Sequence, residues 1–129
     1  MKALTIRQPW ASLFALNVKH METRSWDTKV RGPVAIHAGL AWPYRLPMGC
    51  VVAVGELFQT RSTTNGEHSP DDLERSLGDH SPGRFAWSFA SISPVLLWMP
   101  AKGRQGFWNW DLPDGLNAQL RYPVARAGS

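Results

Sequence analysis

The 129-residue chain lacks several features that would place it in a common class of protein. Its one cysteine, Cys50, cannot form an internal disulfide, so we expect a reducing, cytoplasmic location. No apolar run approaches the roughly 20 residues of a membrane span, and Lys2 and Arg7 bring charge too early for a secretory signal. We expect no membrane association and a single domain over residues 1–129, with a loose tail at 121–129.

Signature motifs of common enzymes and metal sites are also missing. The chain has no glycine-rich phosphate loop, no G-x-S-x-G turn and no H-E-x-x-H pair. His68 and His80 lie among acidic residues, but their spacing matches no metal-ligand motif. We therefore expect no metal and no cofactor. Residues 61–82 indicate a polar loop with a short helix, with Ser69 as N-cap and Pro70 in the first turn.

The charge is unevenly distributed along the chain. It has 14 Lys and Arg residues against 10 Asp and Glu residues, a net charge of +4. Five of the acids fall between residues 67 and 79, beside one base, and the rest of the chain has 13 bases and 5 acids, or +8. A basic body favours a polyanionic partner, although a soluble surface with one acidic loop has the same composition.

Short strands and two helices make up the expected secondary structure. A helix begins near Pro9 and ends near Asn17, which tolerates a left-handed backbone. The apolar run from Val51 to Val54 is typical of a strand buried on both faces. The expected extended segments are 3–7, 23–26, 32–38, 49–60, 85–98 and 107–110. This pattern indicates an α+β domain built on a curled β-sheet or a small β-barrel.

Polar side chains gather where the first of these elements meet. Gln8, Lys19, Glu22 and Arg24 lie at junctions that a core alone does not explain. In an extended segment, Glu22, Arg24 and Trp26 share one face. Arg can clamp a phosphate, Trp can stack on a base and Glu can accept from an exocyclic amine. The alternative is a Glu22–Arg24 ion pair beside a packed Trp26.

Seven tryptophans are many for this length, and their surroundings differ. The candidates for base stacking are Trp10, Trp26 and Trp42, which flank the predicted helix or lie in or beside loops. Those expected in the core or at the closure of the barrel are Trp87, Trp98, Trp108 and Trp110.

Three groups of residues resemble a known family. They are Ile6-Arg7-Gln8-Pro9-Trp10-Ala11-Ser12, then Lys19-x-x-Glu22-x-Arg24-x-Trp26, then Arg31-Gly32-Pro33-Val34-Ala35-Ile36-His37-Ala38. With later pieces at 49–55, 84–87 and 103–110, they are similar, in the same order, to the ASCH (activating-signal-cointegrator homology) family over residues 3–112. The resemblance implies a PUA-like β-barrel with short flanking helices, and binding to RNA or DNA.

The resemblance also implies an enzymatic alternative. Some small ASCH relatives are amidohydrolases that remove the acetyl group of N4-acetylcytidine, with a lysine, a threonine three residues later and a distant glutamate. Lys19 matches the lysine, but Glu22 stands at the threonine position, and the distant glutamate is either Glu56 or Glu74. Thr23 is expected to face the other way. Lys19 and Glu22 are expected to hold each other charged, which favours binding over catalysis.

The leading hypothesis is a monomeric module that binds RNA or single-stranded nucleic acid in a basic cleft. The alternatives use Lys19 and Glu22 as catalytic residues, in an amidohydrolase acting on N4-acetylcytidine-like nucleosides or in a ribonuclease. His37 ends an apolar strand and either lines the cleft or bonds a nearby carbonyl. The candidate binding residues are Arg7, Gln8, Trp10, Lys19, Glu22, Arg24, Trp26, His37, Lys102 and Arg104.

Overall fold

The computed structural model describes residues 1–40 and 45–111, which form one curled sheet of six strands with two short helices. The strands are β1 (Lys2–Ile6), β2 (Met21–Arg24), β3 (Gly32–Ala38), β4 (Cys50–Ser62), β5 (Phe85–Pro100) and β6 (Phe107–Asn109). The helices are α1 (Trp10–Ala15) and α2 (Asp72–Ser76). Within this part of the chain, no helix is long and apolar enough to cross a membrane. The curled-sheet α+β fold expected from the sequence is confirmed.

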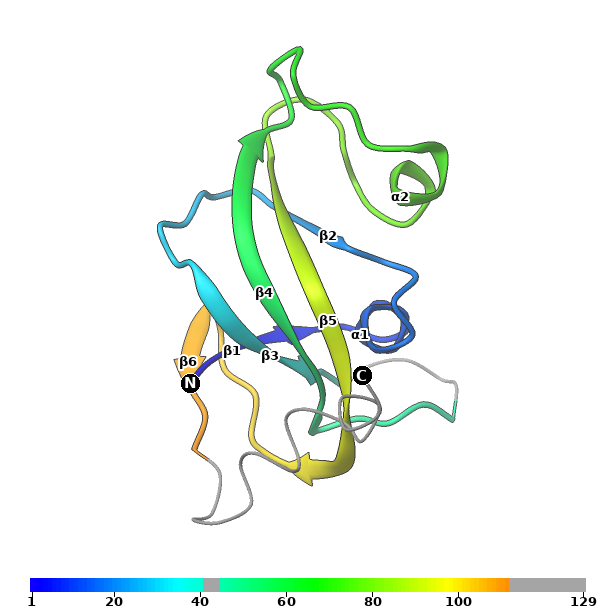
Figure 1. Cartoon of the computed structure of the whole chain (residues 1–129), viewed down its shortest axis with the longest axis vertical. Coiled ribbons are helices and arrows are strands. Elements are labelled where there is room, and N and C mark those ends of the chain that lie inside the picture. Colours follow the sequence, from blue (N-terminus) through cyan, green and yellow to red (C-terminus); the bar gives the residue numbers. More distant parts are fainter. Residues whose placement is uncertain (41–44, 112–129) are drawn as a thin grey trace.

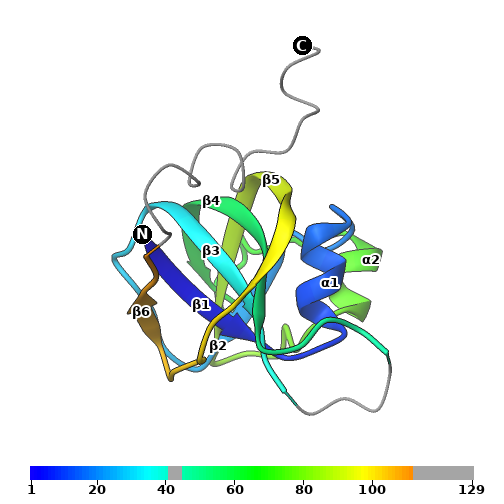
Figure 2. The same ribbon diagram turned by 90° about the horizontal axis from the view of Figure 1, so that it is seen from below.

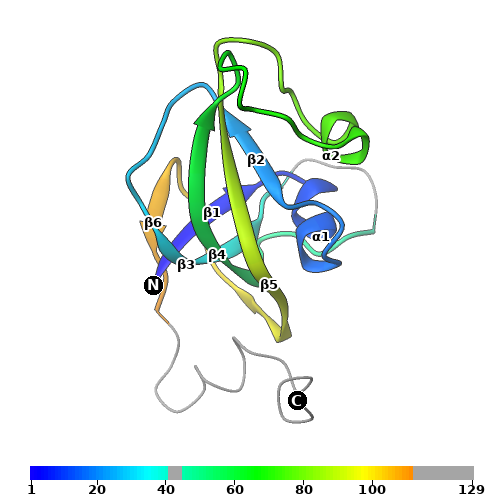
Figure 3. The ribbon, with the colours of Figure 1, turned by 45° about the horizontal axis from the view of Figure 1, so that its top comes forward.

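The strand order across the sheet is β2-β5-β4-β3-β1-β6. Strands β4 and β5 form a long antiparallel pair, and the connection at its far end carries α2 (Figure 1). Strand β1 pairs in parallel with β3, because the chain crosses over through α1 and β2 between them. Register shifts along the β4–β5 pair allow it to bend, and the sheet curls (Figure 2). Both helices lie on the same side of the sheet (Figures 2 and 3).

Buried side chains form two clusters because alternate residues of each strand point to opposite faces. The first cluster includes Phe14 of α1 and Trp87 of β5. The second includes Trp108 of β6 and Trp110 just after it. These three tryptophans are buried, as the sequence predicted. Residues 51–54 of β4 contribute to both clusters, which confirms a strand buried on both faces.

Trp98 corrects one prediction about the core. It is 60% exposed, so its expected place in the core was wrong. Val51 of β4 pairs with Met99, whereas Ala53 pairs with Pro94. Four residues of β5 therefore lie opposite a single residue of β4, and this bulge turns the Trp98 side chain outward.

The helix ends show one success and one error of the sequence analysis. Asn17, two residues beyond α1, has a φ of 60°, as expected for a left-handed helix end. The N-cap of α2 is Asp71 and not Ser69. Asp71 Oδ1 accepts a hydrogen bond from the backbone N–H of Glu74 at 2.8 Å. This bond fixes the start of the helix two residues later than predicted.

Side chains close the gap between the two edges of the sheet, β2 and β6. Arg24 Nη2 donates to the backbone carbonyl of Thr5 in β1 at 3.0 Å. The Trp26 ring packs edge-on against Trp87, with centroids 4.7 Å apart, and against Phe107 of β6, at 6.1 Å. We call this junction the seam.

Candidate nucleic-acid interface

Three hollows open around Thr5, near the end of β1. The Lys19 hollow, about 450 Å³, is lined by Thr5, Ile6, Arg7, Trp10, Lys19, Glu22, Thr23, Arg24, Leu77, Gly78, Asp79 and Arg84. The seam hollow, about 610 Å³, is lined by Thr5, Arg24, Trp26, Arg104, Gln105 and Gly106. The His37 hollow, about 510 Å³, is lined by Thr5, His37, Gly39, Leu40, Gly49, Ala101, Lys102, Gly103, Arg104 and Gln105. Together we call them the Thr5 face.

Lys19 is an almost fully buried cation, with 1% of its surface exposed. Its Nζ donates to the Leu77 carbonyl at 3.0 Å and lies 5.6 Å from the centre of the Phe14 ring. Burial lowers the pKa of Lys19, and the Glu22 and Glu74 carboxylates only partly offset this effect. Glu22 thus raises the pKa of Lys19, as the sequence predicted, but burial has the larger effect and the net pKa is lowered.

Glu22 is paired with Arg24 rather than with Lys19. Arg24 Nε and Nη2 both approach Glu22 Oε2, at 3.1 and 3.0 Å. The guanidinium also lies 5.8 Å from the Trp87 ring centre. The ion pair that the sequence left as an alternative is thus present. Among the described residues, Arg24 Nη1 has no hydrogen-bond partner, so this atom can still donate to a ligand.

Trp26 lies near Arg24, but not because the two residues alternate along one strand, as the sequence predicted. Strand β2 ends at Arg24, so alternation along a strand does not place Trp26 beside it. A bend follows the strand, and Trp26 lies at the seam with 39% of its surface exposed. Arg24 and Trp26 still line the same hollow, together with Arg104. Arg104 belongs to the segment of residues 102–106, which we call the glycine turn.

His37 is an internal support of the interface, with 2% of its surface exposed. Its Nδ1 lies 3.1 Å from Thr5 Oγ1, and its Nε2 lies 2.6 Å from the Ala101 carbonyl oxygen. Trp108 Nε1 donates to the same Thr5 hydroxyl at 3.1 Å. Burial lowers the pKa of His37, although the Ala101 carbonyl opposes this shift. His37 therefore both borders a hollow and bonds a nearby carbonyl.

The glycine turn is held close to His37. A Cβ on Gly103 would lie 2.9 Å from His37 Cε1 and 3.0 Å from Thr5 Oγ1, so a larger residue does not fit without movement. The neighbouring side chains of Lys102 and Arg104 are exposed on either side of Gly103. The turn thus brings two solvated cations to the edge of the Thr5 face.

Gln8 lines none of the three hollows. It is fully buried, and its Nε2 donates to Ser12 Oγ at 2.8 Å and to the Pro47 carbonyl at 2.7 Å. Its Oε1 accepts from the Ser12 backbone N–H at 3.0 Å. The amide joins the start of α1 to the segment before β4. The structure therefore separates Gln8 from the other predicted residues. Trp42, a predicted stacking residue, lies outside the described residues.

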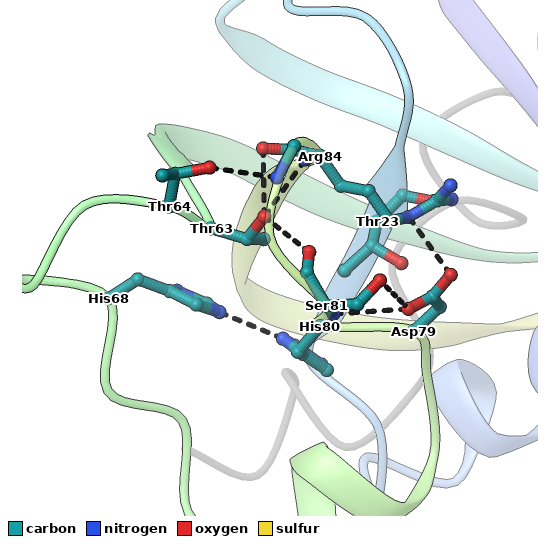
Figure 4. A network of polar contacts seen from close by, with 9 residues as sticks. Thr23, Thr63, Thr64, His68, Asp79, His80, Ser81 and Arg84 are labelled. Carbon is teal, nitrogen blue, oxygen red and sulfur yellow. Dashed lines mark hydrogen bonds and ion pairs between the residues drawn. The ribbon is translucent and has the colours of Figure 1, made fainter.

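Arg84 and Asp79 line the Lys19 hollow and were missed by the sequence analysis. Arg84 Nη2 donates to the Thr23 carbonyl at 3.0 Å, and its Nε lies 3.6 Å from Asp79 Oδ2 (Figure 4). Hydrogen bonds from Ser81 lower the pKa of Asp79. Asp79 comes from the region 61–82 that was expected to be a polar loop, and Arg84 lies just after it. No local pattern marked them, except that Arg84 begins one of the pieces shared with ASCH proteins.

The residues around α2 do not form a metal site. His68 Nε2 lies 2.8 Å from His80 Nδ1, and the two rings are stacked (Figure 4). Within residues 1–40 and 45–111, no group of three or more His, Cys, Asp or Glu side chains is arranged to hold a metal ion. The nearby Glu74 carboxylate accepts from the backbone N–H of His20 and ties α2 to the start of β2.

These features define a curled six-stranded sheet with two short helices and a basic opening. No family model matches the chain. Activating signal cointegrator 1 of Homo sapiens is 27% identical over an alignment that covers 84% of this chain and 22% of that protein. The Mus musculus protein of the same name is 26% identical with the same coverage. The crystal structure of ASCH from Zymomonas mobilis matches with a TM-score of 0.61 and 12% identity, over 94% of this chain and 96% of that one.

The expected ASCH resemblance is thereby confirmed. The chain has the curled-sheet fold of the Zymomonas mobilis ASCH structure. Its sequence is similar to activating signal cointegrator 1, although it spans only about a fifth of that protein's length.

Proposed function

We propose that this domain binds single-stranded RNA across the Thr5 face. The observation that carries this proposal is the excess of cations around three adjoining hollows. The basic residues that line them are Arg7, Lys19, Arg24, Arg84, Lys102 and Arg104, whereas the acidic residues are Glu22 and Asp79. Such a surface attracts a polyanion from solution and holds its phosphates.

The basic residues of this set differ in how easily a phosphate can reach them. Arg7, Lys102 and Arg104 are solvated, so a phosphate can reach them without disrupting the fold. Lys19 is instead buried and bonded to Leu77. The exposed part of Trp26 supplies an aromatic surface on which an unpaired base can stack. Cations interleaved with an aromatic ring are typical of single-strand binding.

Fluorescence anisotropy with a short labelled single-stranded RNA tests the proposal. We expect micromolar-order binding that weakens as the salt concentration rises from about 50 to 200 mM, because bound phosphates release counterions. The double variant Arg7→Ala/Arg104→Ala should bind much more weakly. Lys29→Ala/Arg31→Ala removes the same charge outside the three hollows and serves as the matched control. Absence of binding at low salt by the folded wild type would overturn the proposal.

A second candidate function is amide hydrolysis on an acylated nucleoside such as N4-acetylcytidine. Burial lowers the pKa of Lys19 in a hollow large enough for a nucleoside, which suits an amine that takes up a proton. Thr23, which the strand pattern had turned away, borders the same hollow. Turnover of N4-acetylcytidine that is lost in Lys19→Ala supports this candidate. No turnover by the wild type at substrate saturation excludes it.

A further inference from the structure

The three hollows all border Thr5, but they share their other lining residues unequally. The Lys19 hollow and the seam hollow share Thr5 and Arg24. The seam hollow and the His37 hollow share Thr5, Arg104 and Gln105. The two outer hollows share Thr5 alone. The seam hollow therefore adjoins both of the others and is the middle one of this series.

Each hollow has room for one nucleotide. Their volumes of about 450, 610 and 510 Å³ lie in the range of pockets that hold one small organic ligand. A single-stranded chain can place successive bases in separate hollows, because its bases are not held in pairs. The seam hollow also has the exposed aromatic ring, Trp26, against which its base can stack.

An arginine stands at each of the two junctions in this series. Arg24 lines both the Lys19 hollow and the seam hollow, and Arg104 lines both the seam hollow and the His37 hollow. A nucleic acid has one phosphate between each two successive nucleosides. Guanidinium groups at the junctions therefore match the positions of two internal phosphates.

Both arginines keep donors for this contact. Arg24 uses Nε and Nη2 for Glu22 and Thr5 and has Nη1 left. Arg104 is exposed and makes no hydrogen bond or ion pair with another described residue. Its full set of five N–H donors can turn toward a phosphate.

We propose that the recognised unit is three consecutive nucleotides of single-stranded RNA, one in each hollow, with their two internal phosphates held by Arg24 and Arg104. This inference rests on the proposed function and adds its footprint, which is the number of nucleotides that the surface holds. A mononucleotide occupies one hollow and meets no junction. A base-paired duplex cannot distribute neighbouring bases of one strand among three hollows.

A length series of unlabelled oligonucleotides tests the footprint. Oligouridylates of one to six nucleotides without terminal phosphates compete with a labelled hexanucleotide on the wild-type protein. Affinity should rise with each added nucleotide up to three and then change little. A mononucleoside that competes as well as the trimer, or affinity that keeps rising to six, overturns the footprint. If the labelled hexanucleotide itself does not bind, the proposed function fails with it.

The salt dependence of trimer binding counts the phosphates. Two phosphates held on a single strand give a slope of log affinity against log salt on the order of −1.4. Arg24→Gln and Arg104→Gln should each halve this slope and weaken the trimer on the order of tenfold. Arg31→Gln is the control, since it lines none of the hollows. An unchanged slope in Arg104→Gln overturns the inference, whatever the folding of Arg24→Gln.

Neutral linkages assign each phosphate to its arginine. A trimer with one methylphosphonate linkage lacks the charge at one junction only. It should become insensitive to one arginine substitution and keep its sensitivity to the other, and moving the neutral linkage should exchange the two responses. Equal responses to both placements contradict the pairing of one phosphate with one arginine.

Discussion

The guanidinium of Arg24 donates to the backbone carbonyl of Thr5 at 3.0 Å, and this bond joins two strands that are not paired in the sheet. It holds β2 against β1 at the open side of the curled sheet. The same guanidinium is ion-paired to Glu22 and borders two of the three hollows. The side chain that closes the fold therefore also belongs to the proposed binding surface.

Arg24→Ala should affect both stability and binding. The substitution leaves the Thr5 carbonyl without its donor and the Glu22 carboxylate without its ion-pair partner. We therefore expect destabilisation of about 1–3 kcal/mol. This exceeds the small effect that an exposed ion pair alone would have. Urea unfolding measures it, with the exposed Lys29→Ala as the control. An unchanged midpoint in Arg24→Ala would show that the seam does not need this bond.

Gly103→Ala should destabilise the protein by about 1–3 kcal/mol, because the new methyl group would overlap His37 and the Thr5 hydroxyl. Gly66→Ala is the matched control, since a Cβ there meets no atom within 4 Å. That variant should stay within about 0.5 kcal/mol of the wild type. Thermal unfolding of the two variants side by side gives the comparison. Equal melting temperatures would contradict the close approach of the glycine turn.

The folding stability should fall in mild acid. Burial lowers the pKa of His37, His68 and His80 in the folded protein. The unfolded chain then binds more protons, so stability is fully present above about pH 6.5 and decreases as the pH falls below it. Urea unfolding between about pH 8 and 5 measures the trend.

The histidines can be separated by substitution. His68→Gln/His80→Gln should reduce the slope of stability against pH, since two of the three shifted groups are removed. A slope identical to that of the wild type would assign the acid sensitivity to His37 or to the carboxylates.

Lys19 should give a pH dependence of the same sign, but at alkaline pH. Its pKa is lowered from the ordinary value of 10.5, so the unfolded chain holds the proton longer and stability rises as the pH approaches that value. Lys19→Met keeps an apolar stem in the same space without a titrating group. The difference in unfolding free energy between wild type and variant should increase with alkaline pH. A constant difference would argue that Lys19 keeps an ordinary pKa.

The observed start of α2 is tested by two substitutions. Asp71→Ala removes the N-cap bond to Glu74 and should cost about 1 kcal/mol. Ser69→Ala removes the hydroxyl that the sequence had suggested as the cap and should have little effect, because Ser69 is exposed. Chemical unfolding of both variants decides whether Asp71 or Ser69 is the N-cap of α2. A larger effect at Ser69 would restore the original prediction.

Strand positions were predictable because they depend on local chemistry. Alternating apolar residues in β1 and the unbroken run in β4 determine which side chains are buried, wherever the strands lie in space. Asn17 could likewise be assigned to a helix end from its own backbone preference. Trp98 could not be assigned in this way, because its exposure follows from a mismatch between β4 and β5.

By itself, the sequence determined the curled sheet, its two helices and the basic character of the surface. It also identified Lys19, Arg24, Trp26 and Arg104 as functional candidates. Only the tertiary structure decided which side chains share a hollow. It shows that Gln8 is buried in the interior. It also shows that Arg84 lines a hollow and bonds Thr23, which is 61 residues away in the sequence. The reason is physical: strand and helix preferences act over a few residues, whereas a hollow exists only where distant segments meet.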